Sequence, residues 1–321
     1  MASTSRYMLL YAAPLEDMHE LRWDPQLKEW VIIASLRGGR PIDPDRCPFC
    51  EMHVPDVLAL DNAFPSLLPF PEDVVEGGEE IRRRGRAYGK CEVIVYSPYH
   101  DRQIEKFEPE RIERIVELWK ERYTELSREF QYVFIFENRG KQIGVTLTHP
   151  HGQIYALPFT PPIIQKELDS SEEYFRSNGR CLYCDIIAEE QREGKRMIQE
   201  NDSFVQFVPF WAHWPFESFI IPKKHVTSII GLNRKGVGDL ALLLKSSFSR
   251  YYDLFSGDLS YVMALHQKPS LGEYEHYHFH IEICIVNRGT KKFKFRGGVE
   301  TGAGTFINGI NPEDAAREIK G

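Results

Sequence analysis

The residues of this sequence best suited to chemistry are two histidines, His149 and His151, on either side of Pro150. Pro150 fixes its own φ and disfavours helix at the residue before it. Both imidazoles are therefore expected in extended backbone, where residues two apart share a face. The short apolar runs 143–147 and 154–157 flank the motif and predict strands. This arrangement suits a metal-bound imidazole at His149 beside a reactive imidazole at His151.

Two C-x-x-C pairs, Cys47/Cys50 and Cys181/Cys184, lie in different halves of the chain. In a reducing compartment such pairs indicate metal or redox chemistry. The pairs are 134 residues apart, His100 and His225 are 125 apart, and His149 and His276 are 127 apart. Landmarks that recur in one order at nearly constant spacing indicate a duplicated unit.

Each repeat supplies two cysteines and two histidines, the ligand set of a tetrahedral zinc site. The first predicted zinc site consists of Cys47, Cys50, His100 and His149. The second consists of Cys181, Cys184, His225 and His276. The alternative for each is a reduced cysteine pair in the core with unrelated histidines.

The elements that position these residues follow the same repeat. Apolar residues at helical spacing predict helices over 108–130 and 237–255. Short apolar or alternating runs predict strands over 30–35, 91–97, 132–136, 204–208, 216–221 and 259–265. The prediction is an α+β fold of two tandem units, 1–165 and 166–321, with helices packed on antiparallel sheets.

Composition excludes several classes of protein. The chain has 321 residues and a formal charge of −7, which argues against nucleic-acid binding. The brief apolar run 8–15 is far too short for a membrane span. We therefore expect a cytoplasmic protein.

Phosphorus is the electrophile that fits the polar residues around His151. A positioned neutral imidazole suits nucleophilic attack with a covalent intermediate. Asn138, Thr146 and Gln153 could donate hydrogen bonds to phosphoryl oxygens, where charge must be stabilised during transfer. The alternative is that these polar groups only satisfy the ends of strands.

The sequence resembles the galactose-1-phosphate uridylyltransferase family, whose members are two fused histidine-triad-like halves. The segments that carry the resemblance are 97–100, 149–153 and 210–217. It implies ping-pong exchange of UMP between UDP-glucose (or UDP-galactose) and hexose 1-phosphates, with UMP carried on His151 and Gln153 assisting. It also implies a homodimer whose active sites borrow residues across the interface.

The resemblance places further residues in roles. The matching substrate-binding positions are Arg37, Arg40, Asn62, Asn138, Thr146, Gln153 and Glu300. A second metal, iron or zinc, is implied at Glu167, His266, His278 and His280. These four share no residue with the second predicted zinc site, so both sets could bind metal.

The tail departs from the family pattern. Val299 precedes Glu300, where the family has a tyrosine, and no glutamine follows before Asn308. Glu300 is expected to clamp sugar hydroxyls, but it could instead cap a loop. The tail 302–308 also resembles an ADP-sugar phosphorylase of the same fold, which is one alternative function. A histidine-triad nucleotide-binding protein without turnover is another.

Overall fold

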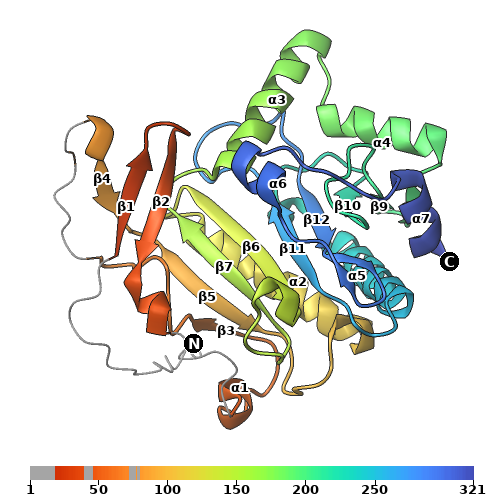
Figure 1. Ribbon diagram of the computed structural model, residues 1–321. Helices are drawn as coiled ribbons and strands as arrows, with labels where there is room; N and C mark the ends of the chain where they lie inside the picture. Colours follow the sequence, from red (N-terminus) through yellow and green to blue (C-terminus); the bar gives the residue numbers. More distant parts are fainter. Residues whose placement is uncertain (1–18, 40–45, 72–76, 78–79) are drawn as a thin grey trace.

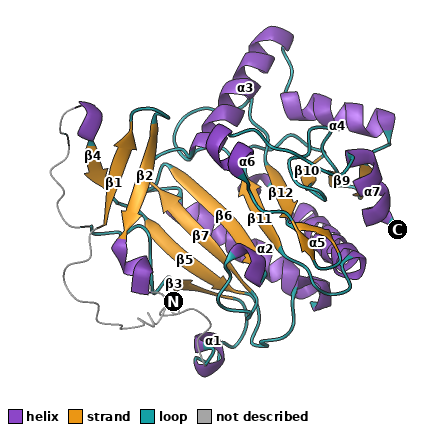
Figure 2. Cartoon of the chain, in the orientation of Figure 1, coloured by secondary structure: helices purple, strands orange, loops and turns teal. Residues whose placement is uncertain are grey.

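The computed structural model describes residues 19–39, 46–71, 77 and 80–321. Its centre is a nine-stranded antiparallel sheet with strand order β3-β5-β7-β6-β11-β12-β10-β9-β8 (Figures 1 and 2). Helices and antiparallel strands together make the α+β fold that the sequence predicts. Arg40 lies outside the described residues.

The strands of the large sheet are β3 (Leu58–Asp61), β5 (Lys90–Val95), β6 (Tyr132–Arg139), β7 (His151–Leu157), β8 (Met197–Glu200), β9 (Phe204–Phe207), β10 (Ser218–Pro222), β11 (Tyr261–His266) and β12 (His280–Ile285). A small sheet contains β1 (His19–Asp24), β2 (Glu29–Ala34) and β4 (Arg84–Arg86), and a two-stranded ribbon contains β13 (Asn287–Gly289) and β14 (Lys292–Phe293). The α-helices are α1 (Pro48–Glu51), α2 (Pro109–Leu126), α3 (Pro162–Asn178), α4 (Leu182–Glu193), α5 (Arg234–Leu254), α6 (Gly298–Ala303) and α7 (Pro312–Lys320).

The internal repeat is visible in the order of the elements. The first half runs β5, α2, β6, β7, and the second runs β10, α5, β11, β12. Strands β6 and β11 pair with each other, so the two halves share one continuous sheet. The predicted boundary between residues 165 and 166 falls within α3 and stays a prediction.

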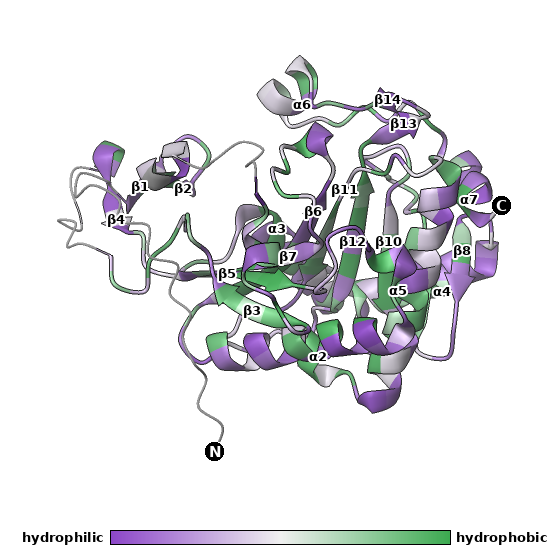
Figure 3. Cartoon of the chain, turned by 90° about the horizontal axis from the view of Figure 1, so that it is seen from below, coloured by the Kyte–Doolittle hydropathy of each residue, from purple (hydrophilic) through white to green (hydrophobic). Residues whose placement is uncertain are grey.

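Helices α2 and α5 cover one face of the sheet, behind it in Figure 1. Helix α2 begins with Pro109 in its first turn, a position where the missing N–H costs nothing. Its buried residues, among them Ile112, Val116 and Trp119, recur at helical spacing and pack with α5 and the sheet in one core. Figure 3 shows polar residues on the outer side of α2.

The other face of the sheet carries the candidate chemistry. Strand alternation turns Ile154 and Ala156 toward the helices and His151, Gln153 and Tyr155 to the opposite face. Helices α3 and α4 pack on that opposite face over the second half (Figure 1).

The strand predicted over residues 143–147 is wrong. The chain leaves β6 through Gly140, which has φ 107°, makes a 3₁₀ turn over Lys141–Ile143, and turns again at Gly144, with φ 77°. Both positive φ values favour glycine and break an extended run. The segment 140–148 is therefore a loop next to His149 and His151. No described helix is long and apolar enough to span a membrane.

Candidate active site and metal clusters

His151 begins β7 on the face away from α2 and α5, and it is 9% exposed. Its Nδ1 lies 2.7 Å from the backbone carbonyl of His149. Because a carbonyl oxygen can only accept, Nδ1 carries the proton, and in the neutral ring Nε2 carries the lone pair. The ring of Phe49 lies 5.7 Å from that of His151 and helps to fix its orientation. The hydrogen bond thus selects, for the neutral ring, the tautomer that a nucleophile needs.

The first predicted metal cluster is brought together. Cys47, Cys50, His100 and His149 each offer a ligand atom, and these atoms all lie within 4.8 Å of one another. The Cys50 thiol lies 3.4 Å from His100 Nδ1 and 3.5 Å from His149 Nδ1. His149 Nε2 donates to the Ser97 carbonyl at 2.7 Å, which leaves Nδ1 as the ligand atom. Burial lowers the pKa of His149 and so favours the neutral ring that a metal requires.

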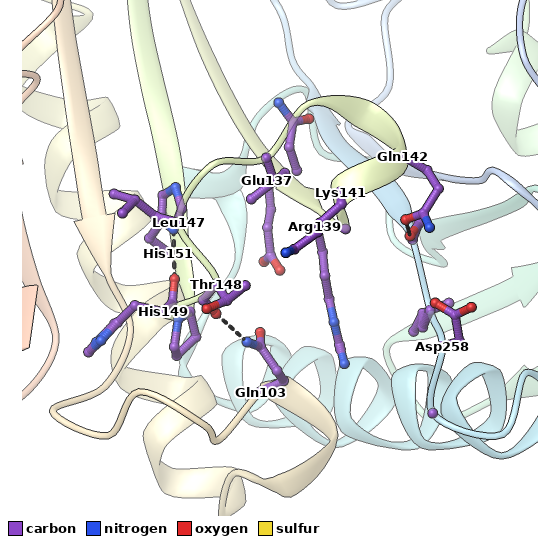
Figure 4. A pocket seen from close by; sticks show the side chains of 17 residues that line it. Gln103, Glu137, Arg139, Lys141, Gln142, Leu147, Thr148, His149, His151 and Asp258 are labelled. Carbon is purple, nitrogen blue, oxygen red and sulfur yellow. Dashed lines mark hydrogen bonds between the residues drawn. The ribbon is translucent and has the colours of Figure 1, made fainter. Parts of the chain in front are cut away.

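A cavity of about 260 Å³ lies beside these histidines, under the loop 140–148 (Figure 4). Its lining includes Asn138, Arg139, Lys141 and His151. Gln103 holds the loop by donating to the backbone carbonyl of Thr148 at 2.8 Å. Arg139 is bound by both carboxylate oxygens of Glu105, at 2.7 and 3.0 Å. The loop 140–148 therefore forms one wall of the candidate active site.

Gln153 and Asn138 belong to neighbouring strands next to His151. Gln153 lies two residues after His151 on the same face of β7 and is paired with Phe136 of β6. Asn138 lies two residues beyond Phe136 on β6, so the register places it opposite His151. Thr146 lies in the loop 140–148 and is partly exposed.

Arg37 and Asn62 lie beside β7 and are connected through Phe64. The Arg37 guanidinium donates to the Phe64 carbonyl at 3.3 Å and to the Tyr155 hydroxyl at 2.9 Å. The Asn62 side chain accepts from the Phe64 N–H at 2.9 Å. Tyr155 was not among the predicted residues. Strand alternation, which puts it on the face of His151 and Gln153, was the signal that could have identified it.

The second metal cluster differs from the prediction by one ligand. Cys181, Cys184 and His225 meet His278, whose Nδ1 lies 3.7 Å from the Cys181 thiol and 3.6 Å from that of Cys184. His276 does not take part: it precedes β12 and lies beside the Tyr274 ring, 6.0 Å away. The correction follows from the register: Phe136 pairs with Gln153 and Ala264 with Glu282, so His149, four residues before Gln153, corresponds to His278, four residues before Glu282.

A carboxylate-rich cluster forms where the iron or zinc set was predicted, again with one exchange. Its members are Glu167, His266, His280 and Glu282. His278 is absent because its ring belongs to the thiolate cluster, and Glu282, which was not predicted, takes its place. His280 Nε2 lies 3.6 Å from a Glu282 oxygen and 3.9 Å from a Glu167 oxygen.

Glu167 and His266 form a buried ion pair within this cluster. Glu167 Oε1 lies 2.9 Å from His266 Nδ1, and Tyr277 donates to Oε2 at 2.6 Å. Burial raises the pKa of Glu167, but the attraction of His266 outweighs it and lowers the pKa to about 2. Burial likewise opposes the charged form of His266, while Glu167 raises its pKa to about 9. The fully buried His280 Nε2 has no hydrogen-bond partner among the described residues, as expected of an atom that faces a ligand.

The register of the sheet shows which residues of the two halves correspond. Phe136 pairs with Gln153 in the first half, and Ala264 pairs with Glu282 in the second. Gln153 therefore corresponds to Glu282.

Two residues before these lie His151 and His280, and the Nδ1–H of each donates to the carbonyl of the histidine two residues earlier, at 2.7 and 3.0 Å. Across the strand pair, Asn138 corresponds to His266. The residues that could bind and attack a phosphoryl group in the first half are Asn138, His151 and Gln153. Their counterparts in the second half, His266, His280 and Glu282, belong to the carboxylate-rich cluster.

Glu300 lies in α6 and is bonded by its own loop. Its carboxylate accepts from the N–H groups of Gly297 and Ile307, at 2.8 and 3.4 Å, and lies 3.0 Å from the Lys294 ammonium. These bonds, the Gly297 N–H foremost, lower the pKa of Glu300. Both carboxylate oxygens therefore have partners within the tail.

Two family profiles match this chain over most of its length. The profile of the galactose-1-phosphate uridyl transferase N-terminal domain matches residues 51–161, and that of the C-terminal domain matches residues 167–319. A galactose-1-phosphate uridylyltransferase from Thermotoga maritima is 35% identical over 314 residues, which cover 94% of this chain and 98% of the relative.

Solved structures agree with these matches. A uridylyltransferase structure superposes with a TM-score of 0.86 at 34% identity, over 94% of this chain and 97% of the other. An ADP-glucose phosphorylase from Arabidopsis thaliana, solved with bound ADP-glucose, superposes with a TM-score of 0.74 at 29% identity, over 94% of this chain and 99% of the other.

Proposed function

Because this chain belongs to the galactose-1-phosphate uridylyltransferase family, we propose that His151 carries the nucleotide in a ping-pong transfer. The chain is a nucleotidyltransferase that exchanges UMP between UDP-glucose and galactose 1-phosphate. The observation that carries the assignment of His151 is the hydrogen bond from its Nδ1 to the His149 carbonyl, because it leaves the lone pair on Nε2.

The reaction has two displacements at one phosphorus. Nε2 of His151 attacks the α-phosphorus of UDP-glucose, a P–N bond forms, and the P–O bond to glucose 1-phosphate breaks. A phosphate oxygen of galactose 1-phosphate then attacks the same phosphorus, and the bond to His151 breaks. Two in-line inversions give net retention at phosphorus, and each step conserves charge without an added cofactor.

The polar residues around His151 supply contacts for the phosphoryl oxygens and the nucleoside. Gln153 and Asn138, on neighbouring strands, are proposed to donate their side-chain amides to the phosphoryl oxygens during transfer. Thr146 is proposed to add a hydroxyl from the loop. Arg37 and Asn62 are proposed to contact the nucleotide from the far end of the site. Arg40 is proposed to assist from outside the described residues.

The metal clusters are proposed to be structural. Two thiolates with two imidazoles favour Zn²⁺, which would be held by Cys47, Cys50, His100 and His149 and by the second cluster, in which His278 is the fourth ligand. Two carboxylates with two imidazoles suit iron or zinc in the third cluster. The first cluster bears on the chemistry because His149 holds the carbonyl that orients His151.

Intact-protein mass spectrometry tests the nucleophile and the base together. Incubation with UDP-glucose should leave a UMP-sized adduct, and His151→Gly should abolish it while metal content stays the same. ADP-glucose serves as the parallel arm, because an AMP-sized adduct would identify an adenylyl enzyme. A full-sized adduct on the His151→Gly protein would refute the assignment.

The second candidate function is an ADP-sugar phosphorylase, and the tail favours testing it. Glu300 is proposed to bind the hexose, yet its carboxylate is bonded within its own loop. A phosphorylase would pass the nucleotide to phosphate and would need no hexose contact in the second step. Acceptor kinetics with galactose 1-phosphate and with plain phosphate separate the two. Loss of hexose selectivity in Glu300→Ala would support the sugar role, and unchanged selectivity would leave the tail structural.

We also propose a homodimer in the cytoplasm. The dimer rests on the family resemblance, in which active sites borrow residues from the partner. The location is inferred from the two C-x-x-C pairs, whose spacing is typical of metal sites in proteins of a reducing compartment. Sedimentation at several protein concentrations would test the dimer.

A further inference from the structure

A group of polar side chains lies in the core directly beneath the nucleophile strand, on the face covered by α2 and α5. Glu137 of β6 is 2% exposed and points to this face, since it alternates with Phe136 and Asn138. Tyr96, Trp119 and Tyr261 belong to the same core cluster. None of these four side chains takes part in the chemistry described above.

Three of the polar atoms in this group lack hydrogen bonds among the described residues. They are Trp119 Nε1, the Tyr96 hydroxyl and Glu137 Oε2. The other oxygen, Oε1, accepts from the Tyr261 hydroxyl. A buried polar group without a hydrogen bond lowers the stability of the fold by about 1–3 kcal/mol. Three such groups side by side therefore call for a common explanation.

The chemistry of the three groups allows one direction of donation. The indole N–H only donates, the hydroxyl both accepts and donates, and the carboxylate only accepts. Trp119 can therefore donate to Tyr96, and Tyr96 to Glu137, whose second oxygen already accepts from Tyr261. The aromatic rings of Tyr96 and Trp119 meet edge to face with centroids 6.1 Å apart.

Tyr96 contacts the chain on both sides of His151. Its backbone N–H donates to the Pro150 carbonyl at 3.1 Å. Its hydroxyl lies against Gly152: a Cβ there would fall within contact distance of the hydroxyl and 2.9 Å from the ring carbon that bears it. A displacement of this ring would therefore move the segment 150–152.

We propose that Trp119, Tyr96, Glu137 and Tyr261 form a buried hydrogen-bonded chain that positions the His151 segment from beneath the sheet. Glu137 and Tyr96 act through Gly152 and are positioning residues. The inference rests on the proposed role of His151. We add that the Tyr96 hydroxyl and the Glu137 carboxylate set how closely Nε2 of His151 approaches phosphorus. A small displacement of Nε2 would greatly lower the rate of nucleotide transfer.

The test separates positioning from folding by a matched pair. Tyr96→Phe removes the hydroxyl beneath His151. Tyr251→Phe removes another fully buried hydroxyl, which donates at 2.8 Å to Ser218 in the second half. The single-turnover rate of nucleotide transfer and the dissociation constant of UDP-glucose are measured for both at pH 8.

We expect Tyr96→Phe to lower the transfer rate by about tenfold, with the dissociation constant changed less than twofold. Tyr251→Phe should leave both values unchanged, although its melting temperature falls. Glu137→Gln replaces one of the two acceptor oxygens by an amide donor, which leaves a single oxygen for the hydroxyls of Tyr261 and Tyr96, and it should reproduce the Tyr96→Phe rate. A wild-type rate in both Tyr96→Phe and Glu137→Gln would overturn the proposal.

A second measurement does not depend on catalysis. The indole N–H resonance of Trp119 should exchange slowly with solvent and shift in Tyr96→Phe, and it should keep its position in Tyr251→Phe. If the Trp119 resonance does not change in Tyr96→Phe, the buried hydrogen-bonded chain is refuted even if His151 proves to be the nucleophile. Absence of any adduct on the wild-type protein would instead refute the proposed function alone.

Discussion

At the scale of the residue, two histidines two positions apart have different roles. His278 lies within 3.7 Å of two thiols, whereas His276 lies outside the described clusters. His278→Ala should therefore lose one metal per chain and lower the melting temperature. His276→Ala is the matched control and should keep its metal. Elemental analysis of both purified proteins measures the difference, and equal metal contents would contradict the ligand assignment.

Glu137 should make stability depend on pH. Burial raises its pKa from 4.5 to about 7, against the smaller effects of Tyr261, Arg139 and Tyr96. A carboxyl whose pKa is higher in the folded state stabilises that state while protonated, and the contribution is lost as pH rises through about 7. Relative to Glu137→Gln, the wild type should lose about 1 kcal/mol of unfolding free energy between pH 6 and pH 8.

Denaturant unfolding of the metal-loaded proteins at the two pH values measures this difference. The comparison with Glu137→Gln cancels the contributions of other titrating groups, including the Glu167–His266 pair. Parallel pH profiles for the two proteins would show that the Glu137 carboxyl does not titrate in this range.

Residue identities were predicted better than residue partners. The type and order of Cys47, Cys50, His100 and His149 sufficed for the first cluster, because thiolates and imidazoles have few other uses at that spacing. The second cluster depended on matching His149 to His276 by residue type and order, whereas the strand register matches His149 to His278. Glu282 was missed for the same reason, since only the strand register shows that it corresponds to Gln153.

At the scale of the element, β7 tolerates no side chain at Gly152. A Cβ there would meet the Tyr96 ring from one side of the strand, and the Phe136 carbonyl lies 3.3 Å away. Gly152→Ala should therefore push β7 away from Tyr96, cost about 1–3 kcal/mol of stability and lower the transfer rate by about a hundredfold.

Gly238→Ala is the matched control. Gly238 lies within α5, where its added methyl would only approach the end of the Glu113 side chain at 3.4 Å. Alanine in a helix interior is favoured over glycine by about 0.5–1 kcal/mol, so this variant should be fully active and more stable. Thermal unfolding and single-turnover assays measure both effects, and an active, stable Gly152→Ala protein would be the contrary result.

Elements with strong periodicity were predicted correctly, and the loop next to the site was not. Helix α2 follows from its apolar spacing, and the second part of β7 follows from the apolar run 154–157. Residues 143–147 are as apolar as a strand, but Gly140 precedes them and Gly144 lies among them, both with positive φ. Positive φ values at single glycines do not alter the pattern of apolar residues. Hydrophobic patterning therefore predicted a strand where the structure has a loop beside the site.

At the scale of the whole molecule, the two halves should unfold together. Strands β6 and β11 pair over five consecutive residues at the centre of the sheet, and residues of both halves pack into one core. Hydrogen exchange should therefore show similar protection for the amides of β6 and β11. A substitution that destabilises one half should lower the protection of both strands. Independent loss of protection in one strand would show two separate folding units.

The pairing of β6 with β11 also has a symmetry that bears on how such a chain can arise. Phe136 and Ala264 are equivalent in the two repeats, and they are paired with each other across the two strands. A residue that faces its own counterpart marks a twofold axis, the relation found in isologous dimers. Two separate copies of one unit would form this contact only at sufficient concentration and at the cost of translational and rotational freedom. Joined in one polypeptide, the halves meet at an effective concentration that dilution cannot lower. Covalent linkage also lets the two copies diverge, so one can keep the reactive imidazole while the other gains ligands for an ion.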